Sequence, residues 1–183
     1  IICWRWGAYL GAGALDNGVR TKISAWIRHH PSIALAKGKI TGQYTNSILA
    51  KRDAKMSGYD EAILMDVNGN VCEGSGENLF VVKNGVLLTP PLSASILAGI
   101  TRETVLTLAQ EEGIPVREAN ITRDQLFLAD EVFFSGTAVE VTPVVEVDNR
   151  PVGEGKPGPI TKKLQARYFD VVKGSDVIHP EWL

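Results

Sequence analysis

Four short stretches of the chain carry residue types that could do chemistry. The first is Ala36-Lys37-Gly38-Lys39-Ile40-Thr41-Gly42, where two lysines stand among small residues just before a predicted helix over residues 44–56. A lysine amine in such a place can attack a carbonyl carbon and form a Schiff base. It can equally be a solvated loop charge, as most lysines are.

The second stretch, Cys72-Glu73-Gly74-Ser75-Gly76-Glu77-Asn78-Leu79-Phe80, places a Gly-x-Gly turn between two predicted strands, with a carboxylate on each side. It is not a dinucleotide fingerprint, because Leu79 stands where a third glycine is needed and no helix follows. It is not a P-loop, because no Gly-Lys-Ser/Thr is present. One reading is a carboxylate that serves a cofactor, and the other is a structural turn with two solvated glutamates.

The third and fourth stretches could bind an anion. Leu97-Ala98-Gly99-Ile100-Thr101-Arg102-Glu103 opens a predicted helix over residues 101–112, and free N–H groups at a helix start favour a phosphate. A threonine N-cap with a glutamate soon after it is also a plain structural device. Ser135-Gly136-Thr137-Ala138 interrupts two apolar strands and can form either an anion nest or a bulge.

Together these stretches supply what pyridoxal phosphate requires. Its aldehyde needs a lysine, its pyridine nitrogen needs a carboxylate that keeps it protonated, and its phosphate needs hydrogen-bond donors such as a helix N-terminus. The sequence therefore predicts a site for this cofactor.

The elements that must position these groups are mostly strands. Alternating apolar and polar residues predict a strand over residues 19–27, and Asn68-Gly69 and Asn84-Gly85 predict two hairpins. The other predicted strands are residues 62–65, 78–83, 86–88, 116–118, 132–135 and 139–147, and the predicted helices are 44–56, 101–112, 123–129 and 160–172. This mixture predicts an α+β or α/β domain with much antiparallel pairing.

The composition argues against several other classes of protein. The 183 residues, 44% of them hydrophobic and 22% charged, suit one globular domain or one domain plus a piece of another. A net charge of -2 without a basic stripe argues against nucleic acid, and no apolar run approaches the roughly 20 residues of a membrane span. Cys3 and Cys72 are expected to be reduced cysteines of a cytoplasmic protein, and no Cys or His spacing predicts a metal site.

The ordered motifs resemble those of fold-type IV aminotransferases. Glu73 through Asn78-Leu79-Phe80, Leu87-x-Thr89 and Leu97-x-Gly99-Ile100-x-Arg102 match the signature of that class. Over nearly its whole length the chain resembles the larger C-terminal domain of bacterial branched-chain-amino-acid aminotransferases. Further matching segments are Trp6-Gly7-Ala8-Tyr9-Leu10-Gly11, Ser24-x-Trp26-x-Arg28, Asp66-Val67-Asn68-Gly69, Ser135-Gly136-Thr137-Ala138, Gly153-Glu154-Gly155 and Gly158-Pro159-Ile160-Thr161-Lys162. The resemblance implies an α/β (α+β) fold, the fold-type IV large domain, which is a strand-rich pseudo-barrel with interspersed helices.

The resemblance also implies roles for individual residues. Lys39 would carry pyridoxal 5'-phosphate as a Schiff base, with Lys37 as its competitor for that role. Tyr44 would hydrogen-bond the ring oxygen of the cofactor, and Glu73 would pair with its pyridine nitrogen. The remaining implied contacts are Leu97 against the ring face, Ile100, Thr101 and Thr137 on the phosphate, Thr137 and Ala138 on the substrate carboxylate, and Arg28 in support of the cofactor end.

The implied activity is transamination of branched-chain L-amino acids (leucine, isoleucine and valine) with 2-oxoglutarate, as in branched-chain amino acid biosynthesis. D-amino-acid aminotransferase and aminodeoxychorismate lyase use the same lysine and glutamate, and a non-catalytic fragment is a further alternative. Residues 1–15 are expected to be the end of a small N-terminal domain and a linker, and residues 16–183 the large cofactor-binding domain, so the chain is expected to lack most of its first domain. The intact protein is expected to be a cytoplasmic homo-oligomer, a dimer or larger, with small-molecule substrates and neither nucleic acid nor membrane as a partner.

Overall fold

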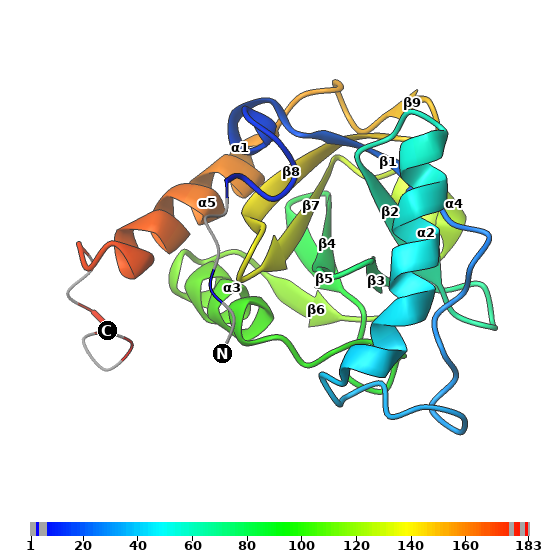
Figure 1. Ribbon diagram of the computed structural model, residues 1–183. Coiled ribbons are helices and arrows are strands. Elements are labelled where there is room, and N and C mark those ends of the chain that lie inside the picture. The colour runs from blue at the N-terminus through cyan, green and yellow to red at the C-terminus, as the bar shows by residue number, and fades with distance from the viewer. Residues whose placement is uncertain (1–2, 4–6, 176–177, 180–181, 183) are drawn as a thin grey trace.

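One sheet closes on itself to form the centre of the molecule (Figure 1). The computed structural model describes residue 3 and residues 7–175, 178–179 and 182. The strands of this part of the chain are β1 (Val19–Ile23), β2 (Glu61–Met65), β3 (Val71–Gly74), β4 (Asn78–Lys83), β5 (Val86–Thr89), β6 (Val116–Glu118), β7 (Glu131–Gly136), β8 (Glu140–Val147) and β9 (Arg150–Pro151). The order β3-β2-β1-β8-β7-β4 becomes a ring because β4 also pairs with β3, while β5 and β6 extend from β4 and β9 pairs with β8. The strand-rich pseudo-barrel predicted from the sequence is confirmed.

The strands of the barrel are apolar on both faces, because each face packs against something. In β4, Leu79 and Val81 belong to the cluster inside the barrel, whereas Phe80 and Val82 belong to a second cluster outside it. This alternation follows from the period of two in a strand. The second cluster lies beneath helices α3 (Ile100–Glu111) and α5 (Pro159–Val172), and it includes Phe80 stacked on Phe133 with ring centroids 4.9 Å apart.

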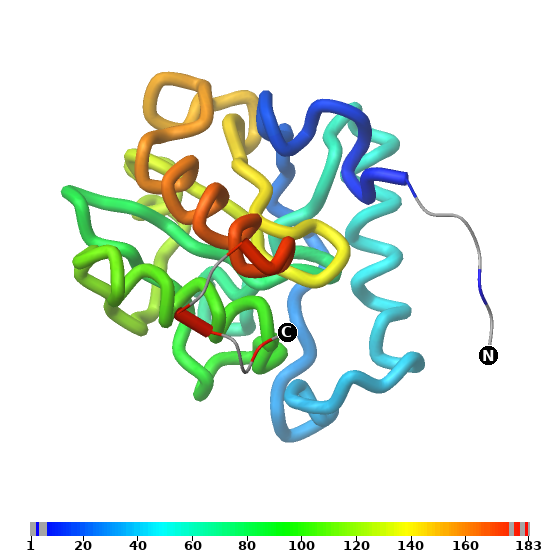
Figure 2. The backbone as a smooth tube through the Cα atoms, turned by 90° about the vertical axis from the view of Figure 1, so that its left-hand side faces the viewer, coloured from blue at the N-terminus to red at the C-terminus, as the bar shows by residue number. Residues whose placement is uncertain are grey.

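Helix α2 (Tyr44–Met56) covers a different side of the barrel. Its Ala50 and Ala54 pack on Ala62 and Leu64 of β2, whose alternate residue Ile63 points into the barrel. Figure 2 shows α2 on one side of the sheet, with α3 and α5 on the other. None of the helices in the described part of the chain has the length and apolar character that crossing a bilayer requires.

Turns and short elements connect the strands. The predicted Asn84-Gly85 hairpin is confirmed, since both residues have positive φ (50° and 76°), as a two-residue I′ turn needs. The hairpin between β2 and β3 is confirmed as well, with Gly69 at φ 82°. Three short elements were not predicted, namely α1 (Ala14–Asn17), the 3-10 helix η1 (Thr41–Gln43) and the β8–β9 hairpin at Asp148-Asn149.

Some predicted boundaries are wrong. The strand over residues 19–27 ends at Ile23, because the hydroxyl of Ser24 accepts a hydrogen bond from the Trp26 N–H and turns the chain. The helix over 123–129 ends at Phe127 as α4 (Arg123–Phe127), and the break between β7 and β8 falls just after Gly136. The predicted strand-like start at residues 1–2 and 4, and Trp6 of a matching segment, lie outside the described residues.

Candidate functional site

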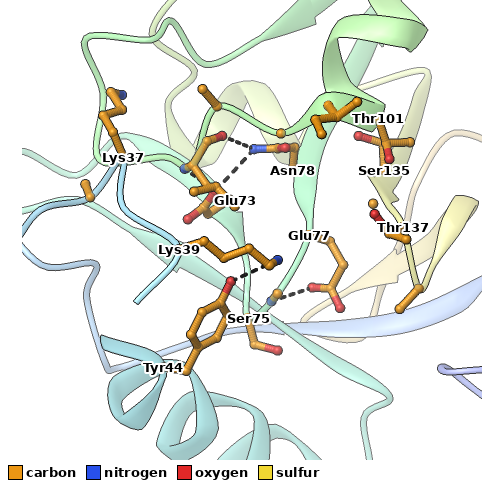
Figure 3. Close-up of a pocket in the computed structure, with 18 of the residues that line it drawn as sticks. Lys37, Lys39, Tyr44, Glu73, Ser75, Glu77, Asn78, Thr101, Ser135 and Thr137 are labelled. Carbon is orange, nitrogen blue, oxygen red and sulfur yellow. Dashed lines mark hydrogen bonds between the residues drawn. The ribbon is translucent and has the colours of Figure 1, made fainter. Parts of the chain in front are cut away.

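The nine predicted site residues surround one pocket of about 420 Å³ (Figure 3). They come from the segment between β1 and the first residue of α2, from the end of β3, from the segment before α3 and its first two residues, and from the turn between β7 and β8. The predicted residues on the pocket wall are Arg28, Lys39, Tyr44, Glu73, Leu97, Ile100, Thr101, Thr137 and Ala138. Further lining residues without an individual predicted role include Ser75, Gly76, Glu77, Asn78, Ser135 and Gly136. The structure thus brings all four chemical stretches together, while the role of each residue stays a prediction.

The two candidate lysines have different surroundings. Lys39 Nζ lies 3.4 Å from the Tyr44 hydroxyl oxygen and can donate to it. Lys37 Nζ instead donates to backbone carbonyls of the segment before α3, those of Leu92, Ala94 (3.1 Å) and Ile96 (3.2 Å). Burial lowers the pKa of Lys37, with Glu73 acting in the opposite direction. The Lys37 amine is therefore engaged by the protein, whereas that of Lys39 points into the pocket beside Tyr44 (Figure 3).

Glu73 is a buried carboxyl held at both oxygens. Its Oε1 forms an ion pair with Arg28 at 2.7 Å, and its Oε2 accepts from the Leu97 N–H at 2.9 Å and from the Asn78 amide at 3.2 Å. Burial raises the pKa of Glu73 to about 7, although Arg28 and the Leu97 N–H both favour the ionised form. Near neutral pH this carboxyl is poised between its two protonation states. The Arg28 guanidinium thus orients the Glu73 carboxyl, and the role expected of Arg28 at the cofactor end stays a prediction.

Asn78 is a positioning residue that the sequence analysis missed. Its amide nitrogen donates both to Glu73 and to the Leu97 carbonyl oxygen at 2.9 Å, so it ties the acid to the segment before α3. Glu73 and Asn78 are direct partners in the β3–β4 pairing. The signal was available, because a tight turn through Gly74 and Gly76 puts the residues that flank it opposite each other.

The start of α3 offers backbone donors to an anion. Its N-cap is Gly99, which has no side chain to satisfy the first N–H groups of the helix. Thr101, the second residue of α3, has a backbone N–H in the first turn of the helix, where no carbonyl oxygen of the same helix can accept from it. Ser135, on strand β7, has a fully buried hydroxyl. No residue in the described part of the chain forms a hydrogen bond with it. Since buried hydroxyls are normally bonded, this one points to a ligand.

The geometry therefore combines an amine, a buried acid and an anion-binding corner in one pocket. The segment matched by the amino-transferase class IV family is residues 4–147, which includes all nine predicted site residues. The chain is 50% identical to a branched-chain-amino-acid aminotransferase of Pseudomonas aeruginosa over 182 residues, which cover 100% of this chain and 59% of that protein. The chain thus spans about three fifths of the length of this relative.

Solved structures give the same result. The branched-chain amino acid aminotransferase of Escherichia coli is 49% identical, with a TM-score of 0.95 over 98% of this chain and 59% of that one. The branched-chain amino acid aminotransferase of Thermobaculum terrenum, solved in its PLP-form (holo-form), is 39% identical, with a TM-score of 0.89 over 91% of this chain and 55% of that one. These similarities confirm both the predicted fold class and the resemblance drawn from the motifs.

Proposed function

Because the chain belongs to the amino-transferase class IV family, we propose that it holds pyridoxal 5'-phosphate on Lys39 and transfers the amino group of branched-chain L-amino acids to 2-oxoglutarate. The substrates expected are leucine, isoleucine and valine. The observation that carries this proposal is the placement of Lys39 and the buried Glu73 around one pocket that also contains the start of α3.

The residues present fit this cofactor. A protonated pyridine nitrogen beside Glu73 would supply a cation to a carboxyl whose pKa burial has raised to about 7. A phosphate near the start of α3 would give the Ser135 hydroxyl the acceptor it lacks among the described residues. In the cofactor-free protein, the burial of the Glu73 carboxyl and the unbonded Ser135 hydroxyl both cost free energy. A bound cofactor would remove these costs.

When bound, pyridoxal 5'-phosphate supplies an aldehyde that condenses with amines and a ring that withdraws electrons. Lys39 supplies the amine that anchors it, and its Nζ can take a proton from the substrate Cα and return it. Tyr44, whose hydroxyl oxygen lies 3.4 Å from that Nζ, orients the amine. Glu73, oriented by Arg28 and Asn78, provides the negative charge that keeps a ring nitrogen protonated. Thr137 and Ala138, on an exposed turn at the pocket wall, would bind the substrate carboxylate through their backbone N–H groups.

Chemical trapping tests the anchor. The full-length protein is incubated with pyridoxal 5'-phosphate, reduced with borohydride and digested, and the labelled peptide is sequenced. We expect the label on Lys39, because the Lys37 amine is held by carbonyl oxygens. A label on Lys37 would contradict the assignment. Lys37→Met is the matched control, and it should leave the label where it is.

Substrate assays test the reaction. With 2-oxoglutarate as acceptor, L-leucine, L-isoleucine and L-valine should yield glutamate, and D-alanine should not. Turnover of D-alanine alone, or release of pyruvate from aminodeoxychorismate, would replace the proposed activity with that of another fold-type IV enzyme. Glu73→Gln should retain bound cofactor and lose most of the turnover, since an amide cannot hold the ring nitrogen as a cation.

We also propose that residues 16–183 form the cofactor-binding domain of a cytoplasmic homo-oligomer. Exposed apolar side chains on residues 26–48, the segment that also contributes Arg28, Lys39 and Tyr44 to the pocket, support an interface. These exposed residues are Trp26, Ile27, Ile33, Leu35, Ile40 and Ile48. Both cysteines are free thiols, as is usual in a reducing compartment. Light scattering on the full-length protein should give a mass of at least two chains.

A further inference from the structure

A second group of ionisable side chains lies beside the pocket and has no part in the proposed reaction. Tyr9 precedes α1, Lys51 is on α2, Glu61 begins β2 and Glu77 ends the turn before β4. Glu77 is also a pocket-lining residue. Four separate segments therefore bring one lysine, one tyrosine and two carboxyls together.

The charges of this group do not balance if both carboxyls are ionised. Glu61 is fully buried and Glu77 is 3% exposed. Lys51 Nζ lies 2.8 Å from Glu61 Oε2 and 3.8 Å from the Tyr9 ring centroid, and it also hydrogen-bonds the Tyr9 side chain. One cation thus faces two buried carboxyls, and a second buried negative charge without a partner is costly.

A single proton between the carboxyls removes this imbalance. The Glu77 side chain lies within hydrogen-bonding contact of Glu61, and no donor among the described residues reaches Glu77 Oε1. Two carboxylates in contact repel each other unless one of them is protonated. Burial and the charge of Glu61 raise the pKa of Glu77 well above its usual range, against the opposing effects of the Gly76 N–H and of Lys51.

We propose that Glu61 and Glu77 share one proton, and that this pair is a positioning unit which holds the Ser75–Gly76 turn at the pocket wall. Glu77 Oε2 accepts from the Gly76 N–H at 3.0 Å, and its backbone carbonyl accepts from the Gly74 N–H at 2.7 Å. A Cβ on Gly74 would lie 2.3 Å from Glu77 Oε2, so the carboxyl packs directly on the turn.

The turn held in this way reaches the substrate end of the pocket. A Cβ on Gly136 would lie 3.8 Å from the Gly76 carbonyl oxygen, which places the Gly76 turn against the turn that carries Thr137. The effect of the pair on the substrate rests on the proposed function. The shared proton and the hold on Gly76 do not, because they concern only this chain.

The pH dependence of folding tests the shared proton. The folded pair keeps one proton at pH values where both carboxyls of the unfolded chain are ionised, so folding takes up a proton. The folding equilibrium constant of the unmodified protein, divided by that of Glu77→Gln, should therefore fall about tenfold per pH unit above about pH 5.5, until the pair ionises. The contribution of Glu73 is common to both proteins and cancels. Glu154→Gln, an exposed replacement of the same kind, is the control and should give a flat ratio.

A flat ratio for Glu77→Gln as well would overturn the shared proton. Glu61→Gln gives a second measurement, since it leaves Glu77 as the sole carboxyl facing Lys51. The folding equilibrium constant of the unmodified protein, divided by that of Glu61→Gln, should therefore fall with pH as it does for Glu77→Gln, and the contribution of Glu73 again cancels. A flat ratio for Glu61→Gln would place the proton elsewhere and contradict the proposal. All of these measurements are made by urea unfolding without cofactor, so they stand whether or not the protein proves to be a transaminase.

Amide hydrogen exchange tests the positioning. In Glu77→Ala the Gly76 amide loses its acceptor and should exchange roughly tenfold faster, whereas Glu77→Gln keeps an acceptor oxygen and should restore most of the protection. Equal protection of Gly76 in the unmodified protein and in Glu77→Ala would refute the positioning role. If Glu77→Ala does not fold, Glu77→Gln still gives a test. Loss of Gly76 protection in Glu77→Gln, which keeps an acceptor oxygen, would also refute the positioning role.

Discussion

Gly99, the N-cap of α3, is the position where the smallest substitution should have a large and specific effect. A Cβ added there would lie 2.2 Å from the Asn78 side-chain oxygen and 3.4 Å from its Cγ. Gly99 has φ -73° and ψ 138°, a conformation that alanine adopts readily, so Gly99→Ala introduces no backbone strain. The consequence of Gly99→Ala is therefore displacement of the Asn78 amide.

The cost follows from what that amide holds. Asn78 donates to the buried Glu73 carboxyl and to the Leu97 carbonyl oxygen. A hydrogen bond to a charged group contributes about 1.5–3 kcal/mol and a neutral one about 1 kcal/mol. Alanine in place of glycine returns about 0.4–1 kcal/mol by restricting the unfolded chain. The free energy of unfolding should thus fall by about 2–3 kcal/mol.

Urea unfolding of the cofactor-free protein, followed by circular dichroism, measures this loss. Gly42→Ala is the matched control, because no atom lies within 4 Å of its added Cβ and its φ is not positive. The control should raise stability by about 0.4–1 kcal/mol, because alanine restricts the unfolded chain at Gly42 as well. In a double-mutant cycle, Gly99→Ala should cost little once Asn78→Ala has made room.

Two results would refute the reasoning. If Gly99→Ala is as stable as Gly42→Ala, the Asn78 amide moves freely and does not fix Glu73. If the losses of Gly99→Ala and Asn78→Ala are additive, the alanine acts through something other than the amide. Either result would also weaken the assignment of Asn78 as a positioning residue.

Two further predictions concern buried carboxyls. The pKa of Glu73 is raised from 4.5 to about 7, so its contribution to stability is complete below about pH 4.5 and is lost as the pH rises through 7. This loss amounts to about 3 kcal/mol in the cofactor-free protein, and urea unfolding at a series of pH values should show it flattened in Glu73→Gln. Glu131 accepts from the N–H groups of Ile160 and Thr161 and from the Thr161 hydroxyl at the start of α5, so Glu131→Gln should cost about 2 kcal/mol or more, measured by thermal unfolding.

Local patterns account for the elements that the sequence predicted well. The helix over Tyr44–Met56 and the strand over Asn78–Lys83 have the predicted bounds, because side-chain spacing and turn residues define them locally. The predicted strand over residues 19–27 ends at Ile23, because the Ser24 hydroxyl turns the chain and the hydrogen bonds that follow go to residues distant in the sequence. The Ser24 N–H donates to the Ile63 carbonyl oxygen and the Arg28 N–H to that of Met65, so the chain leaves β1 and carries Arg28 to Glu73.

The residues of the site also differ in how far the local sequence could predict them. Residues that react or bind, such as Lys39 and Glu73, belong to recognisable motifs, and all nine predicted residues line the pocket. Residues that position them depend on the register between strands. Asn78 matters because it lies opposite Glu73, and Ser135 because it lies opposite Asn78 on the next strand. The pairing of Asn78 with Glu73 could have been predicted from the tight turn between them, whereas a single sequence does not contain the register that places Ser135 opposite Asn78.

The two glutamates that flank the β3–β4 turn show how far the environment decides chemistry. In the sequence, Glu73 and Glu77 are equivalent carboxylates on either side of one Gly-x-Gly turn, and both are buried. Glu73 has Arg28 to itself and accepts from two N–H donors, so an added ring cation would hold it ionised. Glu77 has one N–H donor and a lysine already paired with Glu61, so a proton must supply the missing partner. The two carboxyls are four residues apart in the sequence, yet Glu73 lies against Arg28 and Asn78, whereas Glu77 lies against Glu61 and the Gly76 N–H.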